Sequence, residues 1–148
     1  MIEVHEMRYE KNGKERAEVQ LLPYCSLFKD RYRKMYNDCY HEMREELDIK
    51  PYDFIRDDSF FGENMEDVYL LTEDDELIGS VALKDGEIDD LLVDKRYQGK
   101  GYGKKILIWA IENIKADTPV LHVAKWNKRA IDLYEKTGFK ITRTFRAG

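Results

Sequence analysis

Apolar residues recur along the chain with distinct periods, and each period predicts one kind of element. Between residues 27 and 47 the apolar side chains are spaced by three and four positions, which predicts one long amphipathic helix from Leu27 to Leu47. These side chains are Phe28, Tyr32, Met35, Tyr36, Cys39, Met43 and Leu47. Pro51 ends this helix, and the stretch from Tyr52 to Phe61 is expected to form a shorter second helix.

The start of the chain predicts a β-hairpin. Ile2 to Tyr9 and Arg16 to Leu22 flank the sequence Lys11-Asn12-Gly13-Lys14. Because Asn-Gly readily adopts the positive φ angles of a tight turn, the two flanking stretches are expected to pair as strands.

Three further strands are predicted in the middle of the chain, from Val68 to Thr72, from Leu77 to Leu83 and from Glu87 to Val93. The short turns between them are typical of an antiparallel meander. A glycine-rich turn, a helix, a strand, a second helix and a last strand follow, over residues 98–103, 106–114, 119–124, 127–137 and 139–145. Asn127 can cap the second of these helices, and Gly138 can end it.

Length and charge limit the size of the fold and the range of partners. A chain of 148 residues suits one domain, so residues 1–148 are expected to form a single domain. The net charge of −5 has the wrong sign for binding phosphate backbones, so no nucleic acid partner is expected. No apolar run approaches the roughly 18 residues that span a bilayer, and the charged start does not resemble a signal peptide. The sequence therefore predicts a cytoplasmic protein with no membrane partner.

The cysteines and histidines give no sign of a disulfide or a metal site. Cys25 and Cys39 are expected in one helix, roughly 21 Å apart along its axis, which is too far for a disulfide, and both are expected to be buried thiols. The three histidines, His5, His41 and His122, are scattered, and no Cys or His stands at metal-ligand spacing. No metal is therefore expected.

The segment from Gln98 to Gly103 is the most informative in the chain. Glycines at 99, 101 and 103 remove three Cβ atoms, so a phosphate can approach the backbone, and the next helix offers free N–H groups and the positive end of its dipole. The cations around it are Lys95, Arg96, Lys100, Lys104 and Lys105. This pattern predicts a cradle for a pyrophosphate-bearing cofactor. The alternative is a structural glycine turn with a solvated basic face.

Two common nucleotide motifs do not fit this segment. The P-loop needs Ser or Thr after Gly-Lys, whereas Lys105 follows Gly103-Lys104, and the spacing to an earlier glycine also fails. The dinucleotide fingerprint G-x-G-x-x-G fails because the glycines are spaced G-x-G-x-G and the preceding strands are predicted to be antiparallel.

A third pattern fits, and it is supported by a second motif. Gln98, Gly101 and Gly103 match (Q/R)-x-x-G-x-(G/A) after the apolar strand Leu91-Leu92-Val93. Residues 121–139, LHVAKWNKRAIDLYEKTGF, match N-x-x-A-x-x-(L)-Y-x-x-x-G-F. In this order the two motifs resemble the GNAT superfamily of N-acetyltransferases. The resemblance covers about residues 68 to 146, while the N-terminal third fits only in having a long helix.

The resemblance implies an α/β fold with a mixed, largely antiparallel sheet, helices on both faces and a splayed strand pair at an acetyl-CoA site. Backbone N–H groups from Gln98 to Gly103 would bind the pyrophosphate, the strand Leu91 to Val93 would pair with the pantetheine, and Asn127 would contact the cofactor arm. The implied cofactor-binding residues are Leu91, Leu92, Val93, Gln98, Gly99, Lys100, Gly101, Tyr102, Gly103, Lys104, Asn127 and Tyr134. Asn127 could instead be only a helix cap.

The resemblance also makes Tyr134 the general acid of the transfer. A phenol with an ordinary pKa near 10 stays protonated at pH 7 and can donate to a departing thiolate. A purely structural role in the core is the alternative for this side chain.

A general base is needed because an alkyl ammonium with a pKa near 10.4 costs about 4.6 kcal/mol to deprotonate at pH 7. Glu87, Asp89 and Asp90 lie beside the predicted thioester position. The sequence favours Asp90 or Asp89 without deciding among the three, and a water chain or merely solvated acids are the alternatives. Ile88, Leu91 and Val93 cannot share one face under strict alternation, which predicts a one-residue bulge near Asp89-Asp90.

These patterns together predict an acetyl-CoA-dependent N-acetyltransferase that acts on a primary amine by direct attack. A non-catalytic acyl-CoA-binding module and an interaction domain with structural glycines are the alternatives. Acidic residues in the acceptor region favour a cationic amine; they are Asp57, Asp58, Glu63, Glu66 and Asp67. The protein is expected to be a monomer or homodimer. The family usually adds a hairpin after the Gly-Phe strand, so the N-terminal hairpin or a neighbouring subunit is expected to close that edge.

Overall fold

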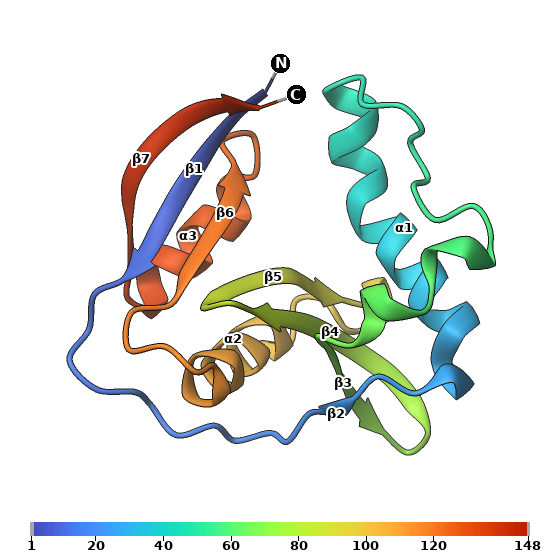
Figure 1. The fold of residues 1–148 in the computed structure, drawn as a ribbon, viewed down its shortest axis with the longest axis horizontal. Helices are drawn as coiled ribbons and strands as arrows, with labels where there is room; N and C mark the ends of the chain where they lie inside the picture. The colour runs from blue at the N-terminus through green and yellow to red at the C-terminus, as the bar shows by residue number, and fades with distance from the viewer. Residues whose placement is uncertain (1, 148) are drawn as a thin grey trace.

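The computed structural model describes residues 2–147, which form a seven-stranded sheet with three α-helices (Figure 1). The strands are β1 (Ile2–Tyr9), β2 (Leu22–Pro23), β3 (Val68–Glu73), β4 (Glu76–Lys84), β5 (Glu87–Val93), β6 (Val120–Ala124) and β7 (Phe139–Ala147). The helices are α1 (Lys29–Glu46), α2 (Tyr102–Asn113) and α3 (Lys128–Thr137). The strand order is β2-β3-β4-β5-β6-β1-β7, and only β5 and β6 pair in parallel, which confirms the mixed, largely antiparallel sheet.

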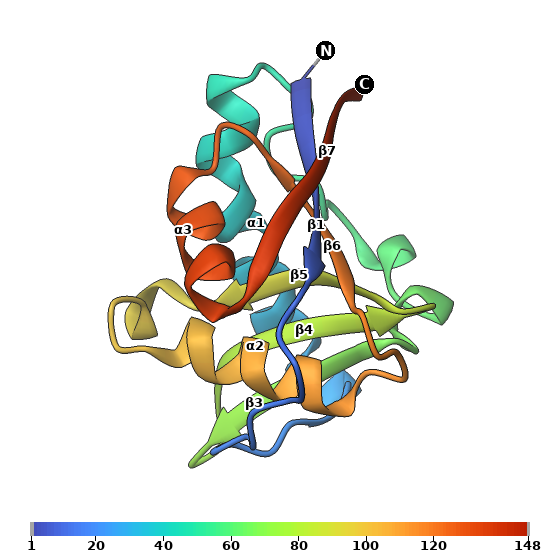
Figure 2. The same cartoon turned by 90° about the vertical axis from the view of Figure 1, so that its left-hand side faces the viewer.

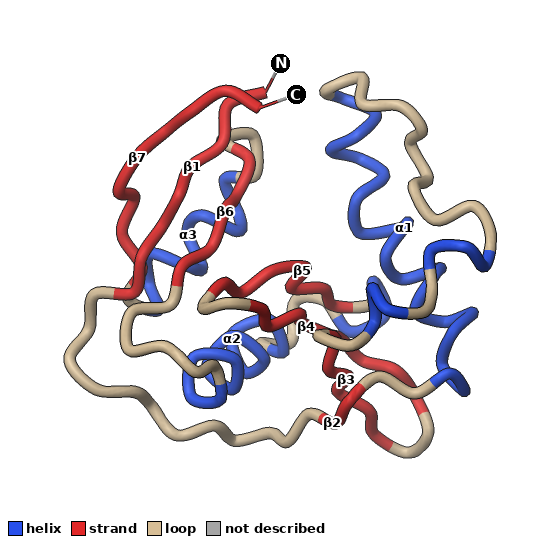
Figure 3. The backbone as a smooth tube through the Cα atoms, in the orientation of Figure 1, coloured by secondary structure: helices blue, strands red, loops and turns tan. Residues whose placement is uncertain are grey.

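The predicted N-terminal hairpin is wrong. β1 forms, but residues 10–21 run as a long loop without a strand, and the short β2 then pairs with β3 at the far edge (Figure 3). β1 instead lies between β6 and β7, with Glu6 opposite His122 on one side and Arg143 on the other. This central position buries Met7 and Tyr9, which an isolated two-stranded hairpin would leave partly in water. The N-terminal strand alone therefore occupies the place for which a hairpin was expected.

The meander of β3, β4 and β5 is confirmed, and so is the predicted bulge in β5. Ser80 of β4 lies opposite Leu92 of β5, whereas Ala82 lies opposite Asp89, so β5 holds one extra residue between these pairs. Asp90 lies in the bulge with a φ of +46°, in the left-handed region that Asp tolerates better than most residues.

The bulge accompanies a splay between β5 and β6. These two strands pair only at Glu87 with Val120 and at Ile88 with Leu121, and beyond these pairs they diverge (Figures 1 and 2). The second half of β5 therefore has β4 on one side and no strand on the other. This confirms the splayed strand pair that the sequence resemblance implied.

Helices cover both faces of the sheet, as predicted, and each side has its own apolar core. On one face, Tyr32, Met35 and Tyr36 of α1 pack over β3, β4 and β5. On the other face, Ile106 and Leu107 of α2 are fully buried, and α3 covers the strands near β7 (Figure 2). The predicted helix over residues 27–47 forms as α1, and its first residues form a 3-10 turn at Ser26–Phe28.

Gly79 marks the closest approach of α2 to the sheet. A Cβ at this position would lie 2.5 Å from the Leu92 carbonyl oxygen and 2.6 Å from Cδ1 of Ile106. The Gly79→Ala variant is therefore expected to lose about 1–3 kcal/mol of unfolding free energy, measured by urea titration, because both the backbone of β5 at Leu92 and the Ile106 side chain of α2 must shift to accept the methyl group.

The matched control for this prediction is Gly103→Ala. The added Cβ would lie 3.6 Å from Cδ2 of Leu133, an ordinary contact, and alanine favours a helix over glycine. This control should be as stable as the parent protein or slightly more so. Parental stability of Gly79→Ala would show that the approach of α2 is not limited by the side chain at this position.

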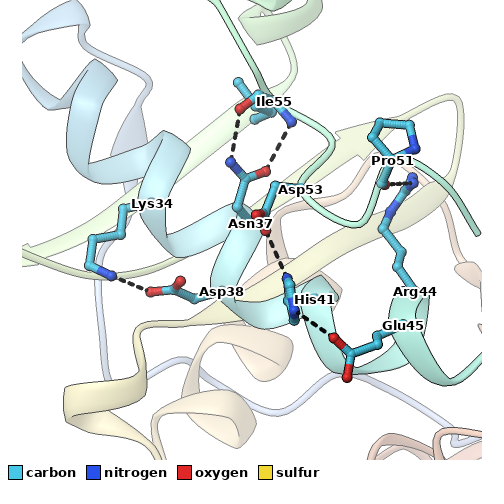
Figure 4. Close-up of polar contacts among 9 residues, drawn as sticks. All are labelled: Lys34, Asn37, Asp38, His41, Arg44, Glu45, Pro51, Asp53 and Ile55. Atoms are coloured by element: carbon cyan, nitrogen blue, oxygen red, sulfur yellow. Dashed lines mark hydrogen bonds and ion pairs between the residues drawn. The ribbon is translucent and has the colours of Figure 1, made fainter.

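The predicted second helix over residues 52–61 is wrong, apart from a short 3-10 turn at Asp58–Phe60. The segment is instead tied to α1 by side chains (Figure 4). Asn37 donates to the Ile55 carbonyl (2.8 Å) and accepts from the Ile55 N–H (2.9 Å), and Arg44 donates to the carbonyl of Pro51. These contacts satisfy backbone groups that a helix would otherwise pair internally. They also hold Ile55, which is buried, against α1.

His41 of α1 forms a further link between this helix and the segment after it. Nδ1 of His41 lies 2.9 Å from Asp53 and Nε2 lies 3.2 Å from Glu45 (Figure 4). The hydrogen bond to Asp53, together with the one to Glu45, raises the pKa of His41 above its ordinary value.

The prediction for the cysteines is wrong for Cys25. This residue precedes the 3-10 turn before α1 and is exposed, whereas Cys39 lies within α1 and is half-buried. Both are free thiols. Within residues 2–147, none of the helices combines the length and apolar character needed to cross a membrane.

Candidate active site

A cavity of about 450 Å³ opens where β5, the glycine-rich turn and α3 meet. Its walls come from the unpaired half of β5, from the turn with the first residues of α2, and from one face of α3. The lining includes Leu91, Leu92, Val93, Gln98, Gly99, Gly101, Tyr102, Gly103, Lys104, Asn127 and Tyr134. Of the predicted cofactor-binding residues, only Lys100 does not line this cavity. Two stretches of the chain, residues 91–104 and 127–136, thus form one site together with Cys39 of α1.

The turn before α2 exposes its backbone to the cavity. Gly99 and Gly101 have φ angles of +78° and +86°, and no atom lies within 4 Å of where their Cβ atoms would be. Gly101 is the N-cap of α2 and provides no capping side chain, so no side chain satisfies the N–H groups at this helix start. This backbone can therefore donate hydrogen bonds to an anion, and the helix dipole adds to the attraction.

The positive charge near the cavity comes partly from residues that the sequence analysis did not single out. Arg129 and Lys136 of α3 line the cavity together with Lys104, and Lys136 also pairs with Asp132 at 2.9 Å. Arg129 lies inside the second motif, two residues after Asn127, so its place in that motif could have identified it as a residue of the site. Among the predicted cations, Arg96 pairs with Asp94 and Glu76, and Lys100 lies 5.8 Å from the ring centroid of Tyr97.

Gln98 fixes the loop that leads into the glycine turn. Its side-chain amide donates to the carbonyl oxygen of Val93 at 2.9 Å. The thiol of Cys39 donates to the same oxygen at 3.2 Å, which ties α1 to the end of β5. Burial raises the pKa of the Cys39 thiol to about 11.

One face of α3 contributes Asn127, Ala130 and Tyr134 to the cavity, at spacings of three and four residues. The Asn127 side chain accepts a hydrogen bond from the N–H of Ala130, so its interpretation as a helix cap is confirmed. Because the cap uses only the side-chain oxygen, the amide nitrogen can still act as a donor at the cavity.

Tyr134 is half-buried at the cavity wall, with its ring edge-on to Phe139 at a centroid distance of 6.2 Å. Burial raises its pKa to about 12, and the negative charges of Asp89 and Asp90 raise it further in the same direction. The phenol therefore keeps its proton throughout the neutral range.

The three candidate acids of β5 lie in three different environments. Asp90 is the more enclosed of the aspartates and accepts a hydrogen bond from the Tyr40 hydroxyl at 2.6 Å. Burial and the neighbouring charge of Asp89 raise the pKa of Asp90 to about 6. Asp89 is exposed and accepts from the N–H of Asp90 at 2.8 Å.

Like Asp89 and Asp90, Glu87 is not among the residues that line the cavity, and it lies at the paired end of β5. Its carboxylate contacts Nδ1 of His122 on β6, and Nε2 of His122 lies 3.3 Å from Glu6 on β1. In the sequence, His122 is one of three scattered histidines. No local signal marks this contact, because it depends on the pairing of β5, β6 and β1.

The family comparison agrees with this geometry. Residues 27–139 match the model described as the acetyltransferase (GNAT) family, which is more than half of the chain. The chain belongs to the GNAT family. The match begins at residue 27 and so includes α1 of this GNAT chain, beyond the residues 68–146 that carried the sequence resemblance.

Solved structures share the fold of this GNAT chain at low sequence identity. A protein assigned to the GNAT family from Novosphingobium aromaticivorans DSM 12444 has a TM-score of 0.63 at 15% identity, covering 97% of this chain and 61% of that one. A GNAT-family acetyltransferase from Colwellia psychrerythraea has a TM-score of 0.63 at 9% identity, covering 96% and 53%. The apo form of YjaB from Escherichia coli has a TM-score of 0.62 at 16% identity, covering 84% of each chain.

The GNAT chain therefore spans 61% and 53% of the length of the first two of these proteins. No curated protein sequence matches it significantly. Among residues 2–147, no group of three or more His, Cys, Asp or Glu side chains is arranged to hold a metal ion.

Proposed function

We propose that this GNAT protein transfers an acetyl group from acetyl-CoA to a primary amine. The observation that carries the proposal is the cavity at the splay of β5 and β6, where the uncapped start of α2 and the phenol of Tyr134 line one space. Membership of the acetyltransferase family supports acyl transfer, and the phenol of Tyr134 at the cavity supports a general acid there.

The residues at the cavity fit the chemistry of a coenzyme A arm. The backbone of the glycine turn, with Lys104 and Arg129, suits a diphosphate, since N–H groups and cations surround a space free of side-chain atoms. The unpaired edge of β5 at Leu91 to Val93 suits the amide-bearing pantetheine, which can pair like an added strand. Asn127 would donate to the same arm from its amide nitrogen.

In the proposed reaction, acetyl-CoA supplies the acetyl group as an activated thioester. Asp90 accepts a proton from the ammonium group of the acceptor, and the nitrogen then forms the C–N bond as the C–S bond breaks. Tyr134 donates its proton to the departing sulfur. The second proton lost from the nitrogen returns to Tyr134 through solvent, and Asp90 releases its proton to solvent, so the reaction liberates one proton overall.

The different pKa values support this division of roles between Asp90 and Tyr134. At pH 7, Asp90 with a pKa of about 6 is mostly ionised and able to accept a proton, whereas Tyr134 with a pKa of about 12 holds its proton. A base whose pKa lies near the operating pH transfers protons most effectively. Glu87 with His122 is the competing candidate base.

The acceptor is proposed only as a primary amine, without a further chemical class. Two of the acids predicted to attract a cationic acceptor are used within the fold: Asp57 accepts from the N–H of Ser59, and Asp58 pairs with Lys29 and Arg33. Their charges hold the loop after α1 in place, which weakens the argument for a cationic acceptor that was based on them.

The binding site can be tested with one glycine substitution and a matched control. Gly101→Ala is expected to weaken coenzyme A binding at least about tenfold, because alanine at a φ of +86° strains the turn that presents the N–H groups. Isothermal titration calorimetry with coenzyme A measures this change, and the coenzyme-induced rise in melting temperature should shrink with it.

The control is Gly13→Ala. Gly13 also has a positive φ, +78°, with no atom within 4 Å of its Cβ position, but it lies outside the proposed binding cavity. The two variants should lose similar stability, and Gly13→Ala should keep its coenzyme A affinity. Equal affinities in both variants would remove the glycine turn from the binding site.

Activity itself is tested by the release of free coenzyme A thiol from acetyl-CoA in the presence of a panel of amines. Amine-dependent thiol release with formation of the acetamide supports the enzyme. Tight coenzyme A binding with no turnover on any amine would favour a non-catalytic acyl-CoA-binding module instead. Absence of any stabilisation by coenzyme A would favour an interaction domain whose glycines are structural.

A further inference from the structure

The unpaired half of β5 is supported by α1 through two consecutive side chains. Beyond Ile88, β5 has no hydrogen-bonded partner strand on its β6 side. Cys39 of α1 donates to the Val93 carbonyl at 3.2 Å, and Tyr40 donates to Oδ1 of Asp90 at 2.6 Å. These bonds attach α1 to the bulge and to the end of the strand, at both limits of the segment that lines the cavity.

Tyr40 is itself fixed by its neighbours on α1. Its ring centroid lies 4.8 Å from that of Tyr36, which is buried and packs in turn against Tyr32, Phe54 and Phe60. A phenol held on a rigid helix in this way loses little further side-chain freedom when it donates a hydrogen bond. Its hydroxyl can therefore define the place of the carboxylate that it contacts.

The backbone of β5 does little to fix the position of the Asp90 carboxylate, so a contact from another element is needed. The residue lies in a bulge with a left-handed backbone, and its backbone N–H is used by the Asp89 side chain. The Tyr40 hydroxyl is the side-chain donor that the described structure gives to the Asp90 carboxylate. A hydrogen bond to the charged form of a carboxyl group favours that form.

We propose that Tyr40 is a positioning residue that holds the Asp90 carboxylate ionised and fixed in one orientation in the bulge of β5, next to the residues that line the cavity. This inference rests on the proposed function, in which Asp90 is the base. It assigns to α1 a part in the chemistry, through the contact between Tyr40 and the bulge of β5. No proton passes through Tyr40 in this role, because burial and the charge of Asp90 raise its pKa well above that of an ordinary phenol.

The other titratable groups around Asp90 either disfavour its ionised form or donate no hydrogen bond to it in the described structure. Asp89 on β5 is a like charge that disfavours a second carboxylate. Tyr32 and Tyr36 on α1 and Tyr134 on α3 also sense the charge of Asp90, and no hydrogen bond joins any of the three to it in the described structure. Removal of the Tyr40 hydroxyl therefore leaves no comparable donor.

The test is the pH dependence of the Tyr40→Phe variant, which keeps the ring and its packing. Loss of a hydrogen bond to a carboxylate should raise the apparent pKa of the acidic limb of kcat/KM by about one unit. The rate at pH 6 then falls about fivefold, whereas the rate at pH 8.5 changes by less than about twofold. The KM for acetyl-CoA should stay within about twofold of the parent value.

Tyr36→Phe is the matched control, because it removes a phenol from the same helix without removing a hydrogen bond to Asp90. Its acidic limb should coincide with that of the parent. In an Asp90→Asn background, Tyr40→Phe should cause no further change in the profile. An unmoved limb in Tyr40→Phe, or an equal loss of rate at every pH, would overturn the inference.

A measurement that needs no turnover separates this inference from the proposed function. The carboxyl carbon of Asp90, followed by ¹³C NMR in the full chain, should titrate about one unit higher in Tyr40→Phe than in the parent. An upward shift in a protein that acetylates none of the amines would retain the Tyr40 contact and reject the proposed function. An unchanged titration would reject the role of Tyr40 whether or not the protein is an enzyme.

Discussion

The Tyr134→Phe variant is expected to have a kcat about ten- to a thousandfold below that of the parent, with nearly unchanged coenzyme A affinity. The departing sulfur would leave as an unprotonated thiolate, whereas the phenylalanine ring would still pack edge-on against Phe139. Thiol release under saturating acetyl-CoA and amine gives kcat, and calorimetry with coenzyme A gives the affinity.

Tyr69→Phe is a suitable control for Tyr134→Phe. Tyr69 of β3 is half-buried and packs against Trp109 of α2 at a ring-centroid distance of 5.3 Å. It lies outside the cavity. Its kcat should match that of the parent. The raised pKa of Tyr134, about 12, also predicts that loss of the acid causes no fall in rate up to about pH 10. A turnover number unchanged by Tyr134→Phe would exclude this residue as the acid.

The Asp90→Asn variant is expected to lose activity and gain stability at pH 7. Loss of a general base typically lowers the rate by about two to four orders of magnitude. Asn keeps an oxygen that can accept from Tyr40 and tolerates the left-handed backbone, so the local structure should persist. Steady-state kinetics at pH 7 measures the first effect, and urea unfolding measures the second.

The direction of the stability change follows from the raised pKa of Asp90. The folded protein holds the Asp90 proton up to about pH 6, whereas the unfolded chain loses it near the ordinary value of 3.8. The folded state therefore loses stability as the pH rises from about 4 to 6, by about 3 kcal/mol for a difference of about two units. Asn does not titrate, so the variant should exceed the parent by this amount at pH 7 and by little at pH 4.

Asp89→Asn distinguishes the effect of a buried charge on the free energy of unfolding from the effect of an exposed one. Asp89 is exposed, so its replacement should change stability less than Asp90→Asn does. If Asp90→Asn keeps full activity while Glu87→Gln loses it, the base is Glu87 with His122. If Asp90→Asn is less stable than the parent at pH 7, the carboxylate contributes more to the fold than its desolvation costs.

The arrangement of the acid and the base depends on the splay of two strands. The bulge at Asp90 turns one carboxylate toward α1, and the divergence of β5 from β6 opens the space that Tyr134 reaches from α3. A regular ladder in this region would have paired the edge of β5 with β6. The same local irregularity therefore creates both the opening and the unusual environment of Asp90.

Local patterns of residues were enough to predict several elements of the fold. The three- and four-residue spacing of apolar side chains predicted α1, the clash of Ile88, Leu91 and Val93 with strict alternation predicted the bulge, and Asn127 marked the start of α3. The glycines at positions 99, 101 and 103 likewise predicted the turn before α2. These features depend on local sterics and on hydrogen bonds between residues close in sequence, so a single stretch suffices to predict them.

The partners of those elements depend on contacts between residues that are far apart in the chain. The sequence predicted a strand over residues 2–9 but not its insertion between β6 and β7, and nothing local revealed that Asn37 would hold residues 51–55 out of a helix. The environments of Glu87 and Asp90 likewise depend on His122 and Tyr40, which lie 35 and 50 residues away from them in the chain. Burial and long-range hydrogen bonds set these properties, and a pattern along one strand does not specify which distant groups will supply them.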